Sequence, residues 1–483
     1  MHTGTYPWSA PGTHNGTGQK TQTAHFYQRL LKSGNSHKVK IEAASWLNQH
    51  IVELDVSACD LPVDPLDLPA WMGNEVHLTT QKYAEYLHQR KHGAERRYFG
   101  SRAHALYFLK SAAPTKLVDG AWLYGLLEHW RNPKFSGLIQ TYVEELGDGV
   151  ADKNHVVIYR ALLARYGLDL ADDMDDSFYT QGSIQLALAN NAVSFLPEVI
   201  GFNLGYEQLP LHLLITAYEL NELNIDPYYF TLHTTIDNAD TGHAYRAMQA
   251  VLENLPRWGC ANEFWRRVQA GYKLSNAGAG TTQLIDSFDI DKEVVRIFRK
   301  KSSAGSGAHS DYCRLAGRTV NDWLACPENI EEFLRTMQKS GWIIRGEPVA
   351  HSRFWNLLLG DRAEMFGVFS AYELQVIHDW IRAECSSDGR PFTEDLSQPL
   401  MQKLPSFRVA SRLDAARGVS LLQTPSQMAG QQLLDSDLQM LIEQLLHVDS
   451  EGQEATLLKA MAPAHHWTPA GLYATRLFNA QIL

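Results

Sequence analysis

Cysteine is scarce in this chain of 483 residues, and the few cysteines lie far apart. No two of the five form a Cys-x-x-Cys pair; they are Cys59, Cys260, Cys313, Cys326 and Cys385. This spacing argues against a zinc knuckle, a thioredoxin-type redox site and a disulfide framework. An odd number of cysteines in a long chain also fits a reducing compartment.

Long apolar runs are also missing. No span of about 18 or more apolar residues occurs, so no membrane-spanning helix is predicted. Residues 1–22 are rich in Gly, Thr, Asn and Pro, without the apolar core of a signal peptide or an arginine-rich amphipathic pattern. We therefore expect these residues to form a flexible tail and the protein to be cytoplasmic.

An excess of positive charge is absent. The 43 Lys and Arg residues face 54 Asp and Glu residues, which gives a formal net charge of −11. A chain with this balance is not expected to bind nucleic acid or an anionic membrane surface. The most basic stretch, residues 90–97, is interrupted by Glu95 and is predicted to be a solvated helix face.

Strand patterns are nearly absent, with only two modest candidates at residues 39–43 and 50–56. Over most of the chain, apolar residues recur at spacings of three and four, which predicts helices. The clearest helical segments are residues 26–34, 103–113, 120–130, 135–146, 155–167, 209–223 and 243–255. The sequence therefore predicts an all-α protein.

Small flexible residues follow a charge cluster in RKKSSAGSGAHSDY, residues 299–312, which predicts a linker. We accordingly expect an N-terminal helical region over residues 23–118, a helical core over 119–298 and a C-terminal helical region over 313–483. The Pro- and Ser-rich residues 386–406 predict a second break.

One short segment, FTLHTTIDNADTGHA at residues 230–244, contains four residues of metal-binding type: His233, Asp237, Asp240 and His243. On a single helix the first three share a narrow arc, with His243 at its edge. Imidazole together with carboxylate suits iron or manganese, because structural zinc prefers thiolates and calcium avoids histidine. Taken alone, the segment fits a solvated helix face equally well.

Two upstream segments carry further candidates. Glu144 and Glu145 end one helical pattern, and His155 begins the next one after a Gly-Asp-Gly break. Glu207 stands within an otherwise apolar helical run, where an isolated carboxylate would be costly to bury. Glu219, further along, is predicted to belong to a solvated stripe. Helical bundles build dimetal sites by directing Glu and His side chains inward from several helices.

These residues resemble the heme-oxygenase-like diiron oxidases and oxygenases. The resemblance rests on a Glu-x9-His pair, a glutamate in an apolar helix and a His-x3-Asp pair with a further His. The phrases EELGDG…NHVVIYRALL, GFNLGYE and LHTTIDNADTGHA are similar to those of the long members, often labelled iron-containing redox enzymes. The resemblance covers mainly residues 119–260, and residues 352–381 and 465–478 share it.

The resemblance implies six metal ligands: Glu145, His155, Glu207, His233, Asp237 and His243. Better-studied members carry His-x3-Asp-x2-His, and here the last position of that motif is Asp240. Either Asp240 replaces the last imidazole or a helix bulge brings in His243; we favour His243, which keeps the donor set. Some members add a carboxylate from an earlier helix, for which Glu128 is the candidate.

The same resemblance implies a heme-oxygenase-like helical bundle that binds two Fe(II) per chain and uses O2 as co-substrate. It implies oxidation of a small, amino-acid-derived substrate in a biosynthetic pathway, by N-oxygenation or by oxidative C–C cleavage or desaturation. No catalytic residue beyond the metal ligands is expected. Nearby aromatic residues could line the substrate cavity or simply pack the core: Tyr206, Tyr228, Tyr229 and Phe230.

Two other functions stay open. One is a non-catalytic helical metal-binding or interaction protein. The other is a thiaminase-like hydrolase of the same fold, which would need a nucleophilic cysteine near the carboxylates; Cys260 is the only cysteine near the core helices. The terminal regions could shape the pocket, form a homodimer interface or bind a partner.

Overall fold

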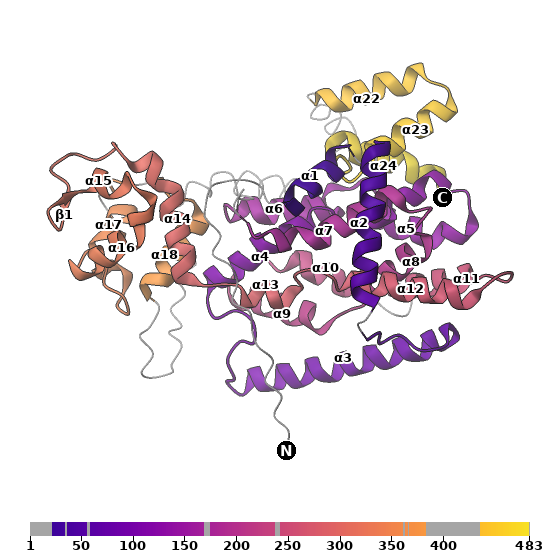
Figure 1. The fold of residues 1–483 in the computed structure, drawn as a ribbon, viewed down its shortest axis with the longest axis horizontal. Coiled ribbons are helices and arrows are strands. Elements are labelled where there is room, and N and C mark those ends of the chain that lie inside the picture. The colour runs from indigo at the N-terminus through magenta and orange to yellow at the C-terminus, as the bar shows by residue number, and fades with distance from the viewer. Residues whose placement is uncertain are drawn as a thin grey trace, which may run out of the picture.

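A computed structural model describes residues 22–33, 36–55, 58–168, 174–236, 242–360, 363–365, 367–382 and 435–482. These residues are predominantly helical (Figure 1). Among them, strands occur only in a two-stranded antiparallel hairpin of β1 (Arg314–Leu315) and β2 (Arg318–Thr319). The prediction of an all-α protein is therefore confirmed.

The helices follow one another with short connections. The first part of the chain forms α1 (Gln22–Ser33), α2 (His37–Asp55), η1 (Pro65–Asp67), α3 (Leu68–Lys91) and α4 (Arg102–Lys116). The middle forms η2 (Ala121–His129), η3 (Pro133–Phe135), α5 (Ser136–Glu145), η4 (Gly147–Gly149), η5 (Ala151–Lys153), α6 (His155–Arg165), η6 (Asp176–Tyr179), α7 (Thr180–Asn191), α8 (Leu196–Tyr206), α9 (Leu211–Glu222), α10 (Tyr228–Ile236), α11 (His243–Asn254), α12 (Ala261–Ser275), α13 (Thr281–Asp286) and α14 (Ile290–Gly305). The last part forms α15 (Val320–Leu324), η7 (Pro327–Asn329), α16 (Ile330–Lys339), η8 (Val349–His351), α17 (Arg353–Leu359), α18 (Ala371–Arg382), α22 (Ser436–His447), α23 (Ser450–Ala460) and α24 (Pro469–Ile482).

Both predicted strand candidates are wrong, because they lie within α2. Val39, Ala43 and Leu47 recur every four residues and are buried. They form one stripe of the helix, which packs against α7 and α12. The β-branched residues that suggested strands therefore belong to a helix with a single apolar face.

Two other predicted elements differ from the structure. The segment at 120–130 was expected to be an α-helix and instead forms the 3-10 helix η2, which begins after Gly120 in a left-handed conformation. The predicted linker at 299–312 is wrong in its first half, because α14 continues to Gly305. Gln22 already belongs to α1, and the rest of the predicted tail, like the break at 386–406, lies outside the described residues.

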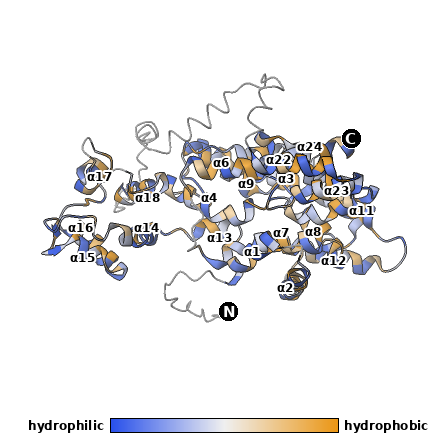
Figure 2. Ribbon diagram, turned by 90° about the horizontal axis from the view of Figure 1, so that it is seen from above, coloured by the Kyte–Doolittle hydropathy of each residue, from blue (hydrophilic) through white to orange (hydrophobic). Residues whose placement is uncertain are grey.

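The interior consists of two apolar clusters (Figure 2). The first joins residues of α4, α6, α9 and α10 to the C-terminal elements α14–α18. The second joins α1 and α2 to η2, α5, α7, α8, α11, α12 and the last helices α22–α24. Both clusters contain residues from either side of the predicted boundaries at 118 and 298. In Figure 1, α14–α18 lie at one end of the molecule, and α22 and α23 pack with α24 elsewhere.

Candidate metal centre

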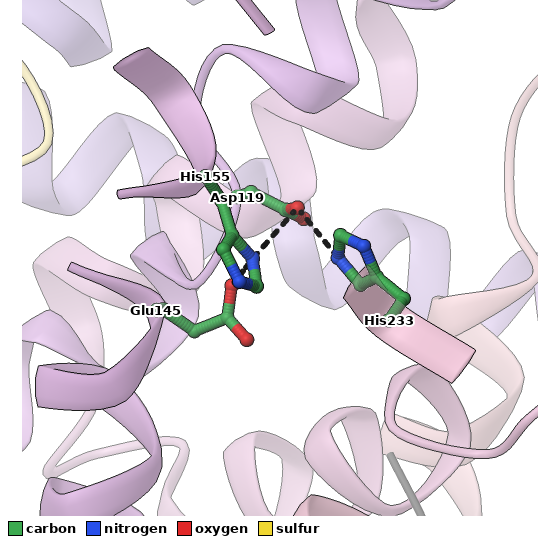
Figure 3. A group of neighbouring side chains, drawn as sticks. All are labelled: Asp119, Glu145, His155 and His233. Atoms are coloured by element: carbon green, nitrogen blue, oxygen red, sulfur yellow. Dashed lines mark ion pairs between the residues drawn. The ribbon is translucent and has the colours of Figure 1, made fainter. Parts of the chain in front are cut away.

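Asp119 lies in the turn between α4 and η2, and its side chain is buried. Its Oδ2 atom lies 3.4 Å from His233 Nε2 and 3.8 Å from His155 Nδ1, so the carboxylate stands between two imidazoles (Figure 3). The Tyr229 hydroxyl donates a short hydrogen bond to the same oxygen. The turn thus delivers a carboxylate into the interior beside two histidines.

Glu145 and His155 are brought together by a tight turn between α5 and α6. Gly147 has φ 64°, and a Cβ there would lie 2.3 Å from the Asn154 backbone nitrogen, so the turn needs glycine. Asn154 caps α6 by accepting a hydrogen bond from Val157 N at 3.0 Å, and its Nδ2 donates to Leu146 O at 3.1 Å. As a result, Glu145 Oε2 lies 2.5 Å from His155 Nδ1.

His233 projects from α10, where its Nδ1 donates to the Tyr229 carbonyl at 2.8 Å. That bond fixes the tautomer, so the lone pair of Nε2 faces Asp119. A lone pair that faces a carboxylate oxygen at 3.4 Å is unfavourable unless a proton or a metal ion lies between them. Backbone bonding of the other ring nitrogen is the usual arrangement of a metal-binding histidine.

Glu207 and His243 approach from the other side of Glu145. Contrary to the prediction, Glu207 is not inside a helical run, because α8 ends at Tyr206 and Glu207 caps it. The interpretation that His233 and His243 share one helix is wrong, because Gly242 is extended and His243 begins α11. His243 Nδ1 lies 3.1 Å from Glu207 Oε2 and 3.2 Å from Glu145 Oε1.

Glu145 is the residue that links two groups of donor atoms. The first group consists of Asp119, Glu145, His155 and His233, and the second of Glu145, Glu207 and His243. Within each group the potential ligand atoms lie within 4.8 Å of one another, and every residue is buried. Oε2 of Glu145 faces the first group and Oε1 faces the second, as a carboxylate that bridges two metal ions would.

Several of these buried atoms lack the hydrogen bonds that burial normally demands. Asp119 Oδ1, Glu145 Oε2 and His155 Nδ1 have no hydrogen-bond partner among the described residues. The last two are close neighbours, but their alignment does not suit a hydrogen bond. Side-chain atoms that converge without hydrogen bonds to one another are in the arrangement expected around a bound cation. Three carboxylates with three imidazoles suit iron or manganese better than structural zinc or calcium.

The electrostatics of the cluster follow from its burial. Burial alone would lower the pKa of His155, but Glu145 and Asp119 outweigh it and raise that pKa to about 10. In the same way burial would raise the pKa of Glu145, yet His155 lowers it to about 2. Without a cation, the positive charge that stabilises Glu145 must therefore come from protonated imidazole, whereas Asp119 is also stabilised by the ammonium of Lys116.

A second layer of polar residues holds the ligands in place. His243 Nε2 donates to Glu144 Oε2 at 3.0 Å, which leaves Nδ1 directed at Glu145 and Glu207. Arg246, one turn further along α11, binds both oxygens of Glu144, one of them at 3.1 Å. Such carboxylate partners orient a histidine ligand and raise its basicity.

Residues 106–275 match the model of a protein family described as iron-containing redox enzyme. This part of the chain is similar to that family. The match covers about a third of the sequence and includes every residue of both donor groups. The family is helical, and the expected resemblance is confirmed over this region. No curated protein and no solved structure shows significant similarity to the chain.

Within the family region, the structure brings together five of the six predicted ligands: Glu145, His155, Glu207, His233 and His243. Asp237, the sixth, and the alternate Asp240 lie outside the described residues. The other alternate, Glu128, is exposed and lines a surface cleft with Arg131 and Phe135, so it does not join the cluster. The carboxylate that joins the cluster from an earlier segment is instead Asp119.

Sequence reasoning missed Asp119 because Val-Asp-Gly has the composition of a turn, and the residue does lie in one. The sequence feature that could have identified Asp119 is its position directly after an apolar helix and before Gly120. Glu219 was also misjudged: it is buried and accepts hydrogen bonds from Tyr86 Oη at 2.7 Å and Phe99 N at 3.0 Å. It is a structural carboxylate of α9.

One alternative receives little support from the site. Cys260, the nucleophile that a thiaminase-like hydrolase would need, is exposed and caps α12 with its sulfur. The carboxylates of the cluster are buried instead.

None of the described helices combines the length and the apolar character needed to cross a membrane.

Proposed function

We propose that this protein is a non-heme diiron oxidase or oxygenase. It would use O2 to oxidise a small, amino-acid-derived substrate, by N-oxygenation or by oxidative C–C cleavage or desaturation. The observation that carries this proposal is the position of Glu145, whose two oxygens face two separate groups of buried donor atoms. The match to iron-containing redox enzymes supports iron as the metal.

In this proposal the ligands divide between two ions. Asp119, His155 and His233 would hold one ion, Glu207 and His243 the other, and Glu145 would bridge them. Asp237 stays a predicted ligand. Two ferrous ions, held by these residues, would supply the electrons for the reduction of O2, which none of these side chains could provide.

The chain's own residues prepare the site for that chemistry. The Tyr229 hydroxyl and the Asp119 carboxylate share a hydrogen bond, and burial and Asp119 raise the pKa of Tyr229 well above its usual value. Tyr229 therefore keeps its proton and holds the carboxylate in one orientation. The burial of all six donor residues excludes bulk water.

Anaerobic titration with Fe(II), followed by metal analysis, tests the proposal. About two irons per chain should bind, and exposure to O2 should consume the gas and give a transient visible absorption. Less than one iron per chain, or no O2 consumption with any amino-acid-derived candidate, would contradict it.

Substitutions test the bridge itself. Glu145→Ala should weaken both sites, because the residue belongs to both donor groups. His233→Ala and Glu207→Ala should each weaken one site. The matched control is Glu128→Ala, which removes an exposed glutamate and should leave iron loading at two. If Glu145→Ala also retained two irons, the bridging assignment would be wrong.

A further inference from the structure

A lysine ammonium group lies beside the metal centre without a carboxylate ion-paired to it in the described part of the chain. Lys116, in the last turn of α4, is three residues before Asp119. Its Nζ lies 3.1 Å from the Tyr206 hydroxyl oxygen, 5.1 Å from the centroid of that ring and 5.6 Å from the centroid of the Tyr229 ring. Tyr229 also binds Asp119, so a single ring separates the ammonium from the cluster.

The nearest described carboxylate is already engaged. Asp119 accepts from Tyr229 and faces His155 and His233. Burial lowers the pKa of Lys116, but Tyr206 and Asp119 outweigh it and raise the pKa above its usual value, so the ammonium remains charged. Once cations occupy the cluster they neutralise Asp119 as well. The charge of Lys116, which is only partly exposed, then has no anion beside it among the described residues, and such a charge favours the arrival of one.

A buried amide adds a second, independent observation. Gln185, on α7, is fully buried, and neither its Oε1 nor its Nε2 has a hydrogen-bond partner among the described residues. It lies close to the Tyr206 hydroxyl, whose pKa burial raises and Gln185 lowers only in part, although the two groups are poorly aligned for a hydrogen bond. The ammonium, the hydroxyl and the amide can all donate, which is what a carboxylate requires of its site.

These residues lie nearer the surface than the metal centre does. Lys116, Tyr206 and His212, at the start of α9, are partly exposed, whereas the donor residues of the cluster are buried. His212 is close to Lys116, since burial and then that ammonium lower its pKa to about 4. The polar group thus lies between solvent and the centre.

We propose that Lys116 and Tyr206, supported by Gln185, bind the carboxylate of the substrate beside the metal centre. The substrate is then a carboxylic acid whose remainder extends towards the ligand cluster, as the side chain of an amino acid would. That the bound acid is a substrate rests on the proposed function, but the anion-binding site itself does not.

Binding of carboxylates to the full-length protein tests this inference. Calorimetric titrations compare acetate, hexanoate and benzoate with acetamide, hexanamide and benzamide, on metal-free and on anaerobic Fe(II)-loaded protein. We expect at least one acid to bind ten-fold or more tightly than its amide. Lys116→Met should remove that preference, Lys116→Arg should restore most of it, and Tyr206→Phe should reduce it.

The control is Lys110→Met, which removes a second lysine of α4, one that is buried and paired with Glu293 at 3.9 Å. It should leave the preference for acids unchanged. Absence of that preference in all three pairs, or an equal preference in Lys116→Met, would overturn the inference. So would acid binding that needs iron but not Lys116. Iron loading is measured on the same samples, so a protein that binds no iron but shows Lys116-dependent acid binding would contradict the proposed function alone.

Discussion

At the scale of single residues, His243 shows how the second layer of the site controls a ligand. One ring nitrogen is bound to Glu144, so only the other is available to an ion. Glu144 is adjacent to the bridging Glu145 in sequence, yet it faces Arg246 and is partly exposed. Two neighbouring glutamates at the end of α5 therefore differ in position: Glu145, which the resemblance implied as a ligand, lies inside the cluster, and Glu144 lies outside it.

This arrangement predicts the effect of Glu144→Gln. Loss of the carboxylate should leave His243 less basic and less well oriented, and lower metal affinity at the Glu207 and His243 site by about 10- to 100-fold. The site that contains Asp119 should keep its affinity. Anaerobic Co(II) titration followed by visible absorption measures the metal affinities of both sites. Glu263→Gln is the control, because Glu263 forms a similar pair with Arg266 on the surface; equal effects of the two variants would contradict the role of Glu144.

A buried histidine outside the donor groups predicts a pH dependence of stability. Burial lowers the pKa of His466 to about 3, and Asn154 Nδ2 donates to its Nδ1 at 3.2 Å. In the unfolded chain His466 binds a proton near pH 6.5, but in the folded chain it does not. The contribution of His466 to the free energy of unfolding is therefore complete above that pH and is lost as the pH falls. Between pH 7 and pH 5 the loss should be about 2 kcal/mol.

Urea unfolding of the metal-free protein at both pH values measures this loss. His466→Gln keeps an acceptor for Asn154 and cannot take up a proton in this range. The free energy of unfolding of the variant should therefore fall by about 2 kcal/mol less than that of the unmodified protein. Identical losses in the two proteins would rule out His466 as the source.

At the scale of elements, most of the donor residues lie at helix ends or in turns. Glu145 ends α5, His155 begins α6, Glu207 caps α8 and His243 begins α11. The Glu145 and His155 pair could be predicted, because the Gly-Asp-Gly break and Asn154 mark the two helix ends. The separation of α10 from α11 could not, because the spacing of His233 and His243 also fits one continuous helix. Asp119 resembled an ordinary turn residue, because a sequence does not show which distant residues a turn will contact.

The turn that carries Asp119 depends on Gly120. This residue has φ 77°, and a Cβ on it would lie 2.9 Å from Glu145 Cβ. Gly120→Ala should cost about 1–2 kcal/mol for the left-handed conformation and about 1–3 kcal/mol for the overpacking, and it should displace Glu145 and reduce iron loading. Thermal unfolding and metal analysis measure both effects.

Gly73, inside α3, is the matched control, since a Cβ there would meet nothing within 4 Å. Gly73→Ala should stabilise the protein by about 0.5–1 kcal/mol and leave iron loading unchanged. A Gly120→Ala protein with normal loading and stability would show that the turn tolerates a side chain.

At the scale of the whole molecule, the last helices cover the turn between two donor residues. Helix α24 packs on η4, which connects Glu145 to His155 (Figure 1). Asn479 Nδ2 donates to Asp148 Oδ1 at 3.2 Å, and the buried Tyr142 hydroxyl donates to Met461 O at 2.7 Å. These contacts join residues more than 300 positions apart, which is why local patterns left the role of the C-terminal region open.

Because of this packing, iron binding should depend on residues outside the region that matches the family. A chain that ends at residue 434 lacks α22–α24 and exposes the apolar side chains of the second cluster, so it should unfold at lower temperature and lose iron during gel filtration. Asn479→Ala removes a single contact and should cause a smaller loss. Glu454→Gln is the control, because it breaks only a surface pair with Arg131 and a bond to Trp130. A truncated protein that retained two irons would show that the core holds the centre without its C-terminal cover.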